Sequence, residues 1–213
     1  MFGLQIAKHF QESDKLALCR QVPAFTEIAE KTGLPETECI DSPFHALTQS
    51  IVHQQLAVRA AAAVFGRFEA LLATVTPENL SRVDDDALRA CGLSGRKIEY
   101  LRGITDAALS GTVDFNRLSE KSDEEVIAEL SSLRGVGTWT AEMLLIFSLG
   151  RRDVLSFKDL GIRNGILQMN GWKTLSERRF EAFRKRCSPY GTLASLYLWR
   201  IKDGGLMTNS NKN

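Results

Sequence analysis

The sequence lacks the features that mark several large protein classes. It has only four cysteines in 213 residues, and no two of them are spaced as C-x-x-C. That spacing excludes a zinc ribbon or a cysteine-ligated iron–sulfur cluster and is typical of reduced thiols inside a cell. No apolar run approaches the roughly 20 residues that cross a membrane. The N-terminus also lacks the basic-then-apolar order of a secretory signal, so we expect a soluble intracellular protein.

Alternation of apolar and polar residues is missing as well, so strands are not expected. Helical periodicity dominates instead, and Phe44, Leu47 and Ile51 fall on one stripe. The same reasoning predicts helices over or near 42–55, 57–72, 76–83, 84–91, 95–110, 123–133, 138–149, 159–169, 176–186 and 189–202. We therefore expect an all-α protein in which residues 1–204 form a single unit and residues 205–213 a disordered tail.

Charge is unevenly divided along the chain. Residues 1–133 carry 13 Lys and Arg against 20 Asp and Glu, giving −7, whereas residues 134–213 carry 14 against 6, giving +8. One basic half in a nearly neutral protein favours binding of a polyanion, although chance segregation on a solvated surface gives the same numbers. Residues 178–186, RRFEAFRKR, are either a nuclear import signal or an ordinary basic helix face.

Two glycines separate the helices predicted around LRGVG. Gly135 and Gly137 permit backbone angles that a Cβ would obstruct, so the chain can reverse tightly. The following helix then begins at Thr138 with free N–H groups and a positive dipole end, which suit a phosphate. A tight turn between packed helices explains the same glycines, and G-x-G alone does not decide between the two.

Four ordered motifs give the sequence a family resemblance. They are SPFHALTQSIVHQQLAVRAAAAV, CGLSGRKIEYL, LRGVGTWTAEMLLIFSL with the following D-V-x-x-x-x-D-L-G-I-R segment, and SPYGTLASLYLWR. The chain resembles the helix–hairpin–helix DNA glycosylase superfamily from about residue 42 to 202. Within it, the pattern is most similar to the alkyl-base, or 3-methyladenine, branch of bacteria and yeasts, including fission-yeast alkyladenine glycosylase homologues.

The resemblance implies two small helical lobes flanking a DNA-binding cleft, a nuclear location, and double-stranded DNA with a damaged or abasic nucleotide as partner. The hairpin would hold DNA backbone with the amides of Gly135, Gly137 and Trp139. No cofactor is implied. A monovalent cation, Na⁺ or K⁺, would be held by the main-chain carbonyls of Ser131, Leu133 and Val136.

Two further segments acquire DNA-binding roles from the resemblance. Gln55 and Leu56 match the wedge that enters the minor groove when the target nucleotide is extruded. Without the family resemblance, the sequence favours Leu56 as a core residue and Gln55 as a helix cap. In the turn GLSGRK, the amides of Ser94 and Gly95 and the side chains of Arg96 and Lys97 match backbone contacts, or a capped helix start.

Trp139 and Met143 match the base pocket of the family. An indole face attracts alkylated purines that carry a positive charge, whereas the competing interpretation is an ordinary core tryptophan. Met143 stands where the bacterial pattern has tyrosine, which makes the pocket poorer in aromatic surface.

Asp159 matches the catalytic carboxylate of the family. Cleavage of an N-glycosidic bond builds positive charge on the sugar, which a carboxylate stabilises. Aspartate is also a favoured helix N-cap, and both roles are compatible. No lysine matches the Schiff-base position of bifunctional relatives, so strand cleavage is not expected.

The residues around Asp159 depart from the family pattern. Ser156 replaces a proline, Lys158 replaces an acid, and Gly191 replaces an arginine, so we infer that both members of one ion pair are exchanged. An inward Lys158 would oppose the cation that the reaction builds, and an outward one would add a phosphate contact. We therefore expect a DNA repair protein that recognises damaged or abasic sites, with excision weak or lost. The alternative is an active monofunctional alkyl-base glycosylase, and a helical protein-interaction module is disfavoured because it leaves the hairpin unexplained.

Overall fold

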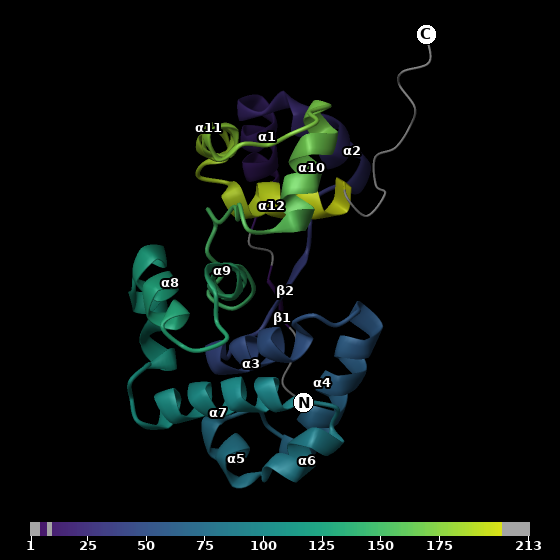
Figure 1. The fold of residues 1–213 in the computed structure, drawn as a ribbon. Coiled ribbons are helices and arrows are strands. Elements are labelled where there is room, and N and C mark those ends of the chain that lie inside the picture. The colour runs from purple at the N-terminus through teal and green to yellow at the C-terminus, as the bar shows by residue number, and fades with distance from the viewer. Residues whose placement is uncertain (1–4, 8–9, 202–213) are drawn as a thin grey trace. The chain divides into compact units, whose positions relative to one another are not determined.

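The computed structural model describes residues 5–7 and 10–201, and the chain divides into two compact units (Figure 1). Unit 1 comprises Met1–Cys39 and Gly150–Asn213, and unit 2 comprises Ile40–Leu149. The tail predicted at 205–213 lies outside the described residues, and the single functional unit over 1–204 stays a prediction. Among the described helices, none is both long enough and apolar enough to span a bilayer.

Unit 2 consists of helices joined by short connections, close to the predicted boundaries. In chain order they are α3 (Pro43–His53), α4 (Val58–Leu72), α5 (Pro77–Arg82), α6 (Asp85–Ala90), α7 (Gly95–Leu109), the 3₁₀ helix η2 (Phe115–Glu120), α8 (Asp123–Ser131) and α9 (Thr138–Phe147). Many begin at a side-chain cap: Ser42, Thr76, Asp84, Ser94 and Ser122 each accept a hydrogen bond from an N–H of the first turn. Each cap of this kind contributes about 1 kcal/mol to helix stability.

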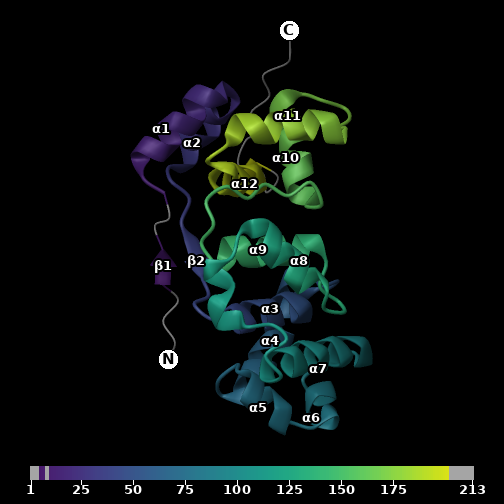
Figure 2. The same ribbon diagram turned by 90° about the vertical axis from the view of Figure 1, so that its left-hand side faces the viewer.

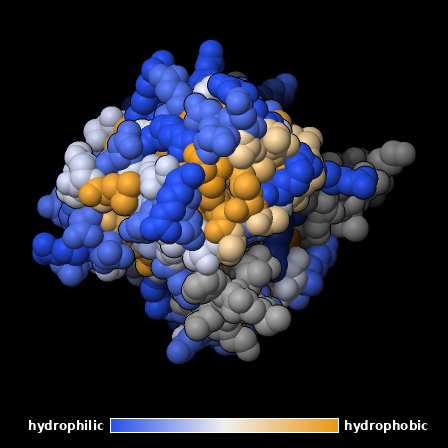
Figure 3. All heavy atoms as spheres, turned by 90° about the horizontal axis from the view of Figure 1, so that it is seen from below, coloured by the Kyte–Doolittle hydropathy of each residue, from blue (hydrophilic) through white to orange (hydrophobic). Residues whose placement is uncertain are grey.

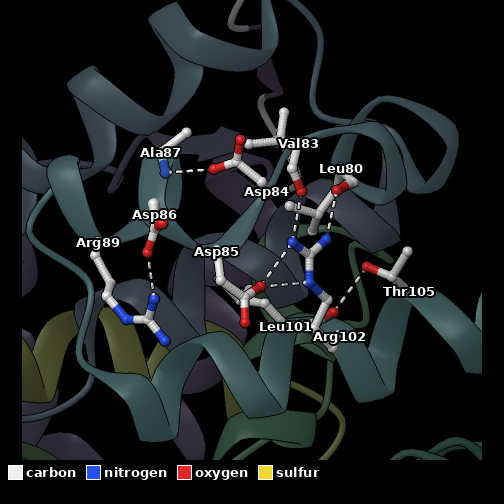
Figure 4. A network of polar contacts seen from close by, with 10 residues as sticks. All are labelled: Leu80, Val83, Asp84, Asp85, Asp86, Ala87, Arg89, Leu101, Arg102 and Thr105. Atoms are coloured by element: carbon white, nitrogen blue, oxygen red, sulfur yellow. Dashed lines mark hydrogen bonds and ion pairs between the residues drawn. The ribbon is translucent and has the colours of Figure 1, made fainter.

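Arg102 on α7 fastens α5 and α6 to the rest of unit 2 (Figure 4). Its guanidinium donates to the carbonyls of Leu80 at 2.7 Å and Val83 at 2.5 Å, where α5 ends. It also pairs with Asp85 of α6 at 2.8 Å. The planar fork of arginine satisfies these acceptors together, so the register of α7 against both short helices is fixed.

The core of unit 2 is formed where α3, α4, α7 and α9 turn apolar stripes toward one another. Phe44 and Phe115 meet edge to face, and Phe65 stacks on Phe68. The opposite face of α4 exposes Ala63, Ala70 and Leu71. Figure 3 shows a hydrophobic patch near the centre of the face that it presents and a smaller hydrophobic group apart from it, both bordered by hydrophilic residues.

Unit 1 joins the two ends of the chain around its own core. It contains β1 (Gln5–Ala7), α1 (Glu12–Gln21), η1 (Pro23–Phe25), α2 (Thr26–Thr32), β2 (Thr37–Cys39), α10 (Leu160–Asn170), α11 (Glu177–Cys187) and α12 (Gly191–Arg200). Figure 2 shows α10, α11 and α12 beside α1 and α2. Phe25, Phe180 and Tyr197 are fully buried among them.

The expectation that strands are absent is wrong for two short segments, although the helical fold class holds. β1 and β2 pair antiparallel, with Ile6 opposite Glu38. Strands of three residues are too short to show a period of two in the sequence. The sequence also made no prediction for α1, which buries only Leu18 and so has no apolar stripe.

Candidate functional site

Gly135 allows the chain to turn tightly between α8 and α9. Gly135 has φ +89°, and a Cβ built there would lie 2.3 Å from the ring of Tyr100 on α7. Both the backbone angle and the contact therefore require glycine. Val136 closes the turn by donating its N–H to the carbonyl of Leu133 at 3.1 Å.

Gly137 does not need glycine for its conformation, so that part of the sequence interpretation is wrong. Its φ is −101°, which any residue adopts, and a Cβ there would meet nothing within 4 Å. Gly137 is the N-cap of α9, and no side chain caps this helix. An added Cβ would therefore obstruct only something that approaches from outside the chain.

The carbonyls and amides proposed for the hairpin lie where two helix ends meet. Ser131 is the last residue of α8, Leu133 and Val136 flank the turn, and Trp139 is in the first turn of α9. The C-terminus of a helix carries partial negative charge on its carbonyls, and an N-terminus carries partial positive charge on its amides. These backbone groups therefore suit a cation and an anion respectively.

The turn after α3 holds Gln55 in a strained conformation. Gln55 has φ +57°, the left-handed region that side chains rarely adopt, and it is exposed. Leu56 is 38% exposed, and its N–H donates to the carbonyl of His53 at 3.3 Å. The alternative in which Leu56 is core and Gln55 caps a helix is wrong, because Gln54 occupies the C-cap of α3.

A second turn, at the start of α7, lies close to the turn after α3 that contains Gln55 and Leu56, called here the predicted wedge turn. Ser94 caps α7 by accepting from the N–H of Lys97, and Gly95 and Arg96 are exposed. The ammonium of Lys97 donates a hydrogen bond to the carbonyl of Val52, near the end of α3, at 2.7 Å. Burial lowers the pKa of Lys97, and the ammonium retains two further donors.

Three contacts bring the hairpin, the wedge turn and the α7 start together in unit 2. The side-chain amide of Gln54 donates a hydrogen bond to the carbonyl of Gly135 at 3.0 Å. Tyr100 packs under Gly135, and Lys97 reaches the end of α3. The sequence did not single out Gln54 or Tyr100, since a polar and an aromatic residue at helical spacing carry no signal by themselves.

His53 lies behind the wedge turn. Its ring packs edge to face on Phe65 at 5.5 Å, and its Nε2 is buried without a hydrogen-bond partner. Burial and then the positive charge of Lys97 lower the pKa of His53, while Glu69 acts in the opposite direction.

The two base-pocket candidates differ in exposure. Trp139 is 39% exposed, and Met143, one turn later on α9, is buried. A tryptophan that merely filled the core would be covered, so exposure favours a role at the surface.

Asp159 lies in unit 1 and caps α10. Its side chain is 7% exposed, and Oδ1 accepts from the N–H of Ile162 at 2.7 Å and from the indole Nε1 of Trp199 at 3.0 Å. Gly161 leaves room for this indole, because a Cβ there would lie 2.9 Å from the Trp199 ring. Trp199 was missed from the sequence, where it appeared only as part of the last helix.

The three residues that depart from the family pattern have different surroundings. Ser156 is fully buried, whereas Lys158 is exposed, which favours the outward alternative for the lysine. Gly191 donates its N–H to Asp153 at 2.9 Å. A Cβ on Gly191 would lie 2.7 Å from the same carboxylate, so the position has no room for arginine unless the Asp153 segment shifts.

Comparison with known proteins agrees with these features. Residues 48–189 match the family described as HhH-GPD superfamily base excision DNA repair protein. The chain belongs to this superfamily. DNA-3-methyladenine glycosylase 1 of Schizosaccharomyces pombe is 38% identical to this HhH-GPD protein over 163 residues, covering 74% of this chain and 72% of the relative. The alkylbase DNA glycosidase-like protein mag2 of the same yeast is 30% identical, covering 75% and 78% respectively.

Solved structures of HhH-GPD relatives have the same fold. DNA-3-methyladenine glycosidase from Bacillus halodurans superposes with a TM-score of 0.79 at 37% identity, covering 90% of each chain. The 3-methyladenine DNA glycosylase of Schizosaccharomyces pombe in complex with abasic DNA gives 0.81 at 31% identity, covering 92% of this chain and 100% of that one. The predicted all-α helix–hairpin–helix glycosylase fold and its alkyl-base branch are confirmed.

Proposed function

We propose that this protein recognises damaged or base-missing nucleotides in duplex DNA by inserting Gln55 and Leu56 into the minor groove. The observation that carries the proposal is the turn itself, which holds an exposed leucine beside a residue at φ +57°. Backbone strain costs stability and is often found at functional sites, and here it adjoins an exposed apolar side chain that an incoming duplex can cover. An amide and a branched alkyl group together fill the gap that an extruded or missing base leaves.

In this proposal the hairpin binds the DNA backbone. The amides of Gly135, Gly137 and Trp139 bind a phosphate at the uncapped start of α9. The fold itself does not require glycine at position 137. The missing Cβ at Gly137 therefore supports close approach of a DNA backbone. Gln54 ties the grip to the wedge through the carbonyl of Gly135.

The hairpin carbonyls fit a monovalent cation. Ser131, Leu133 and Val136 present main-chain oxygens, which are ligands that hard cations prefer, near the negative end of α8. A bound Na⁺ or K⁺ would add positive charge beside the phosphate.

Excision by Asp159 is weak or absent in the main proposal. Ser156 and Gly191 replace the family's proline and arginine. Gly191 packs so closely on Asp153 that an arginine side chain would not fit at position 191. Exposed Trp139 and buried Met143 receive the target base in a pocket poorer in aromatic surface than that of the bacterial pattern.

An active alkyl-base glycosylase is the second candidate, and one observation favours it. Because Lys158 is exposed, water and ions screen its charge from the sugar. Asp159 accepts two hydrogen bonds that hold its side chain at a fixed place, as charge stabilisation requires.

One preparation tests both candidates if base release and binding are measured separately. We expect tighter binding to an abasic-site duplex than to an intact duplex, and little release of 3-methyladenine or 7-methylguanine from methylated DNA. Gln55→Ala with Leu56→Ala should reduce the preference for the abasic duplex about tenfold, because the gap is no longer filled. Leu71→Ala, at a leucine 39% exposed on α4, is the matched control and should change nothing.

Equal loss of affinity for both duplexes would reassign the wedge turn to general contact or stability. Rapid base release by the unmodified protein would establish the second candidate instead.

We propose the nucleus as the place of action, because relatives from two yeasts are DNA-3-methyladenine glycosylases. A fluorescent fusion excluded from the nucleus would contradict this.

A further inference from the structure

Helix α11 of unit 1 carries a group of cations that the described chain does not neutralise. Its basic residues are Arg178, Arg179, Arg184, Lys185 and Arg186. No ion pair joins any of them to a carboxylate among the described residues, although Glu181 stands four residues before Lys185.

Cations of unit 2 behave differently. Five of them are paired with carboxylates: Arg89 with Asp86, Arg102 with Asp85, Arg117 with Glu120, Lys121 with Glu129, and Arg134 with Glu99. Carboxylates thus neutralise five of the ten Lys and Arg residues of unit 2, whereas they neutralise none of the five on α11.

Four of the five cations of α11, all exposed, form one stripe. Phe180, Phe183 and Cys187 turn one face of the helix into the core. On a helical period, Arg178 and Lys185 stand opposite that face, with Arg179 and Arg186 beside them. Seven residues separate the two pairs, which corresponds to about 10.5 Å along the helix. Duplex DNA carries one charge per 3.4 Å of axis on each strand, so the stripe spans about three phosphates of one strand.

The position of Arg178 and Arg179 argues against a purely structural origin. Cations in the last turn of a helix are favourable, which accounts for Arg184, Lys185 and Arg186. Arg178 and Arg179 lie in the first turn, where the dipole disfavours positive charge. Arg179 is held in place by the ring of Trp172, 5.0 Å from its guanidinium carbon.

The balance of charge between the units points the same way. Unit 2, with the hairpin and the wedge turn, has 10 Lys and Arg against 15 Asp and Glu, giving −5. Unit 1 has 17 against 11, giving +6. The residues that would read the lesion thus lie in a unit of net negative charge, and unit 1 is the unit whose net charge attracts DNA at long range.

We propose that the stripe formed by Arg178, Arg179, Lys185 and Arg186 binds the phosphate backbone of duplex DNA away from the lesion. It supplies affinity that does not depend on sequence or damage, while the wedge supplies preference for the lesion. This inference rests on the proposed function, since it takes DNA as the ligand.

The test compares two double variants that remove the same charge. Arg178→Gln with Lys185→Gln alters exposed residues that neither stack nor pair. Arg89→Gln with Arg117→Gln removes two cations that carboxylates already neutralise. Binding to intact and abasic duplexes is measured by fluorescence anisotropy over a range of salt concentrations, with thermal midpoints recorded for each variant.

We expect the α11 variant to weaken binding to both duplexes equally and to leave their ratio unchanged. The slope of log K against log salt should become shallower by about 1.8 if two phosphate contacts are lost. The control variant should keep the slope, and Arg178→Lys with Lys185→Arg should keep both slope and affinity.

An unchanged slope in the α11 variant overturns the inference, as does an equal change in the control. A wild-type protein that does not prefer the abasic duplex contradicts the proposed function instead, whatever the slope shows. Should the double variant unfold, Lys185→Gln alone decides, with about half the change expected.

Discussion

At the level of single residues, the two hairpin glycines have different roles that the sequence presents as one motif. Gly135 is required by its own fold, since it combines φ +89° with direct contact to Tyr100. Gly137 has an ordinary backbone and open space around it. Stability and the proposed phosphate contact can therefore be tested separately at these two glycines.

We predict that Gly135→Ala destabilises the protein and Gly137→Ala does not. The left-handed angle alone costs roughly 1–3 kcal/mol, and overpacking on Tyr100 adds to it. Alanine at Gly137 should leave the free energy of unfolding within about 1 kcal/mol, because its angles are accessible to any residue. Urea unfolding measures both.

The same pair tests the phosphate grip. Gly137→Ala should weaken duplex binding while the thermal midpoint stays near wild type, since its methyl group meets only the incoming backbone. Undiminished binding by this variant would remove Gly137 from the contact surface.

At the level of elements, the end of α3 combines the proposed wedge turn with a half-buried histidine. His53 keeps an unpartnered Nε2, and burial together with the charge of Lys97 lowers its pKa. Burial also lowers the pKa of His45, which pairs with Glu69 at 3.3 Å. Both rings therefore stay neutral in the folded state at a pH where unfolded histidine, with its pKa of 6.5, takes up a proton.

We predict that the protein loses stability as pH falls below about 6.5. Because the folded pKa values lie below the unfolded ones, the unfolded state binds more protons in this window, and stability rises with pH through it. Urea midpoints at pH 7.5 and 5.5 measure the loss.

Replacement of both histidines by glutamine should flatten this part of the dependence, even if the variant is less stable at every pH. An equally steep profile in the double variant would assign the effect to other groups, such as carboxylates.

At the level of the whole molecule, the residues proposed for recognition and the residue proposed for chemistry belong to different units. The wedge turn and hairpin lie in unit 2, and Asp159 lies in unit 1 with Trp199. Stretches far apart in the sequence meet within each unit, as where α12 supplies the indole that holds the carboxylate at the start of α10. A change confined to Asp159 should therefore leave the wedge intact.

We predict that Asp159→Asn preserves abasic-site affinity within about twofold. Asparagine caps a helix as well as aspartate does, so α10 should remain stable and the negative charge alone is removed. Anisotropy on the abasic duplex measures affinity, and any base release by the wild-type protein should disappear in the variant.

Asp159→Ala serves as the comparison, since it also loses the cap and should cost about 1 kcal/mol of stability. A large loss of affinity in Asp159→Asn at unchanged stability would place the carboxylate in DNA binding.

The sequence by itself determined the helical class, most helix boundaries from residue 42 onward and the family. These depend on local information: apolar stripes, caps such as Ser94 and Ser122, and four motifs in a fixed order. It also predicted Asp159 as an N-cap, because capping involves only the next three residues.

Tertiary structure alone decided which partners these residues have. Lys158 is exposed, Gly191 is packed on Asp153, and Gly135, unlike Gly137, lies against an aromatic ring. The contacts of Gly135 and Gly191 join residues 35 or more positions apart, and burial depends on every element that packs nearby. Spacing along the chain contains neither quantity, so two identical residues in one motif, as in G-V-G, acquire different constraints only when the chain folds.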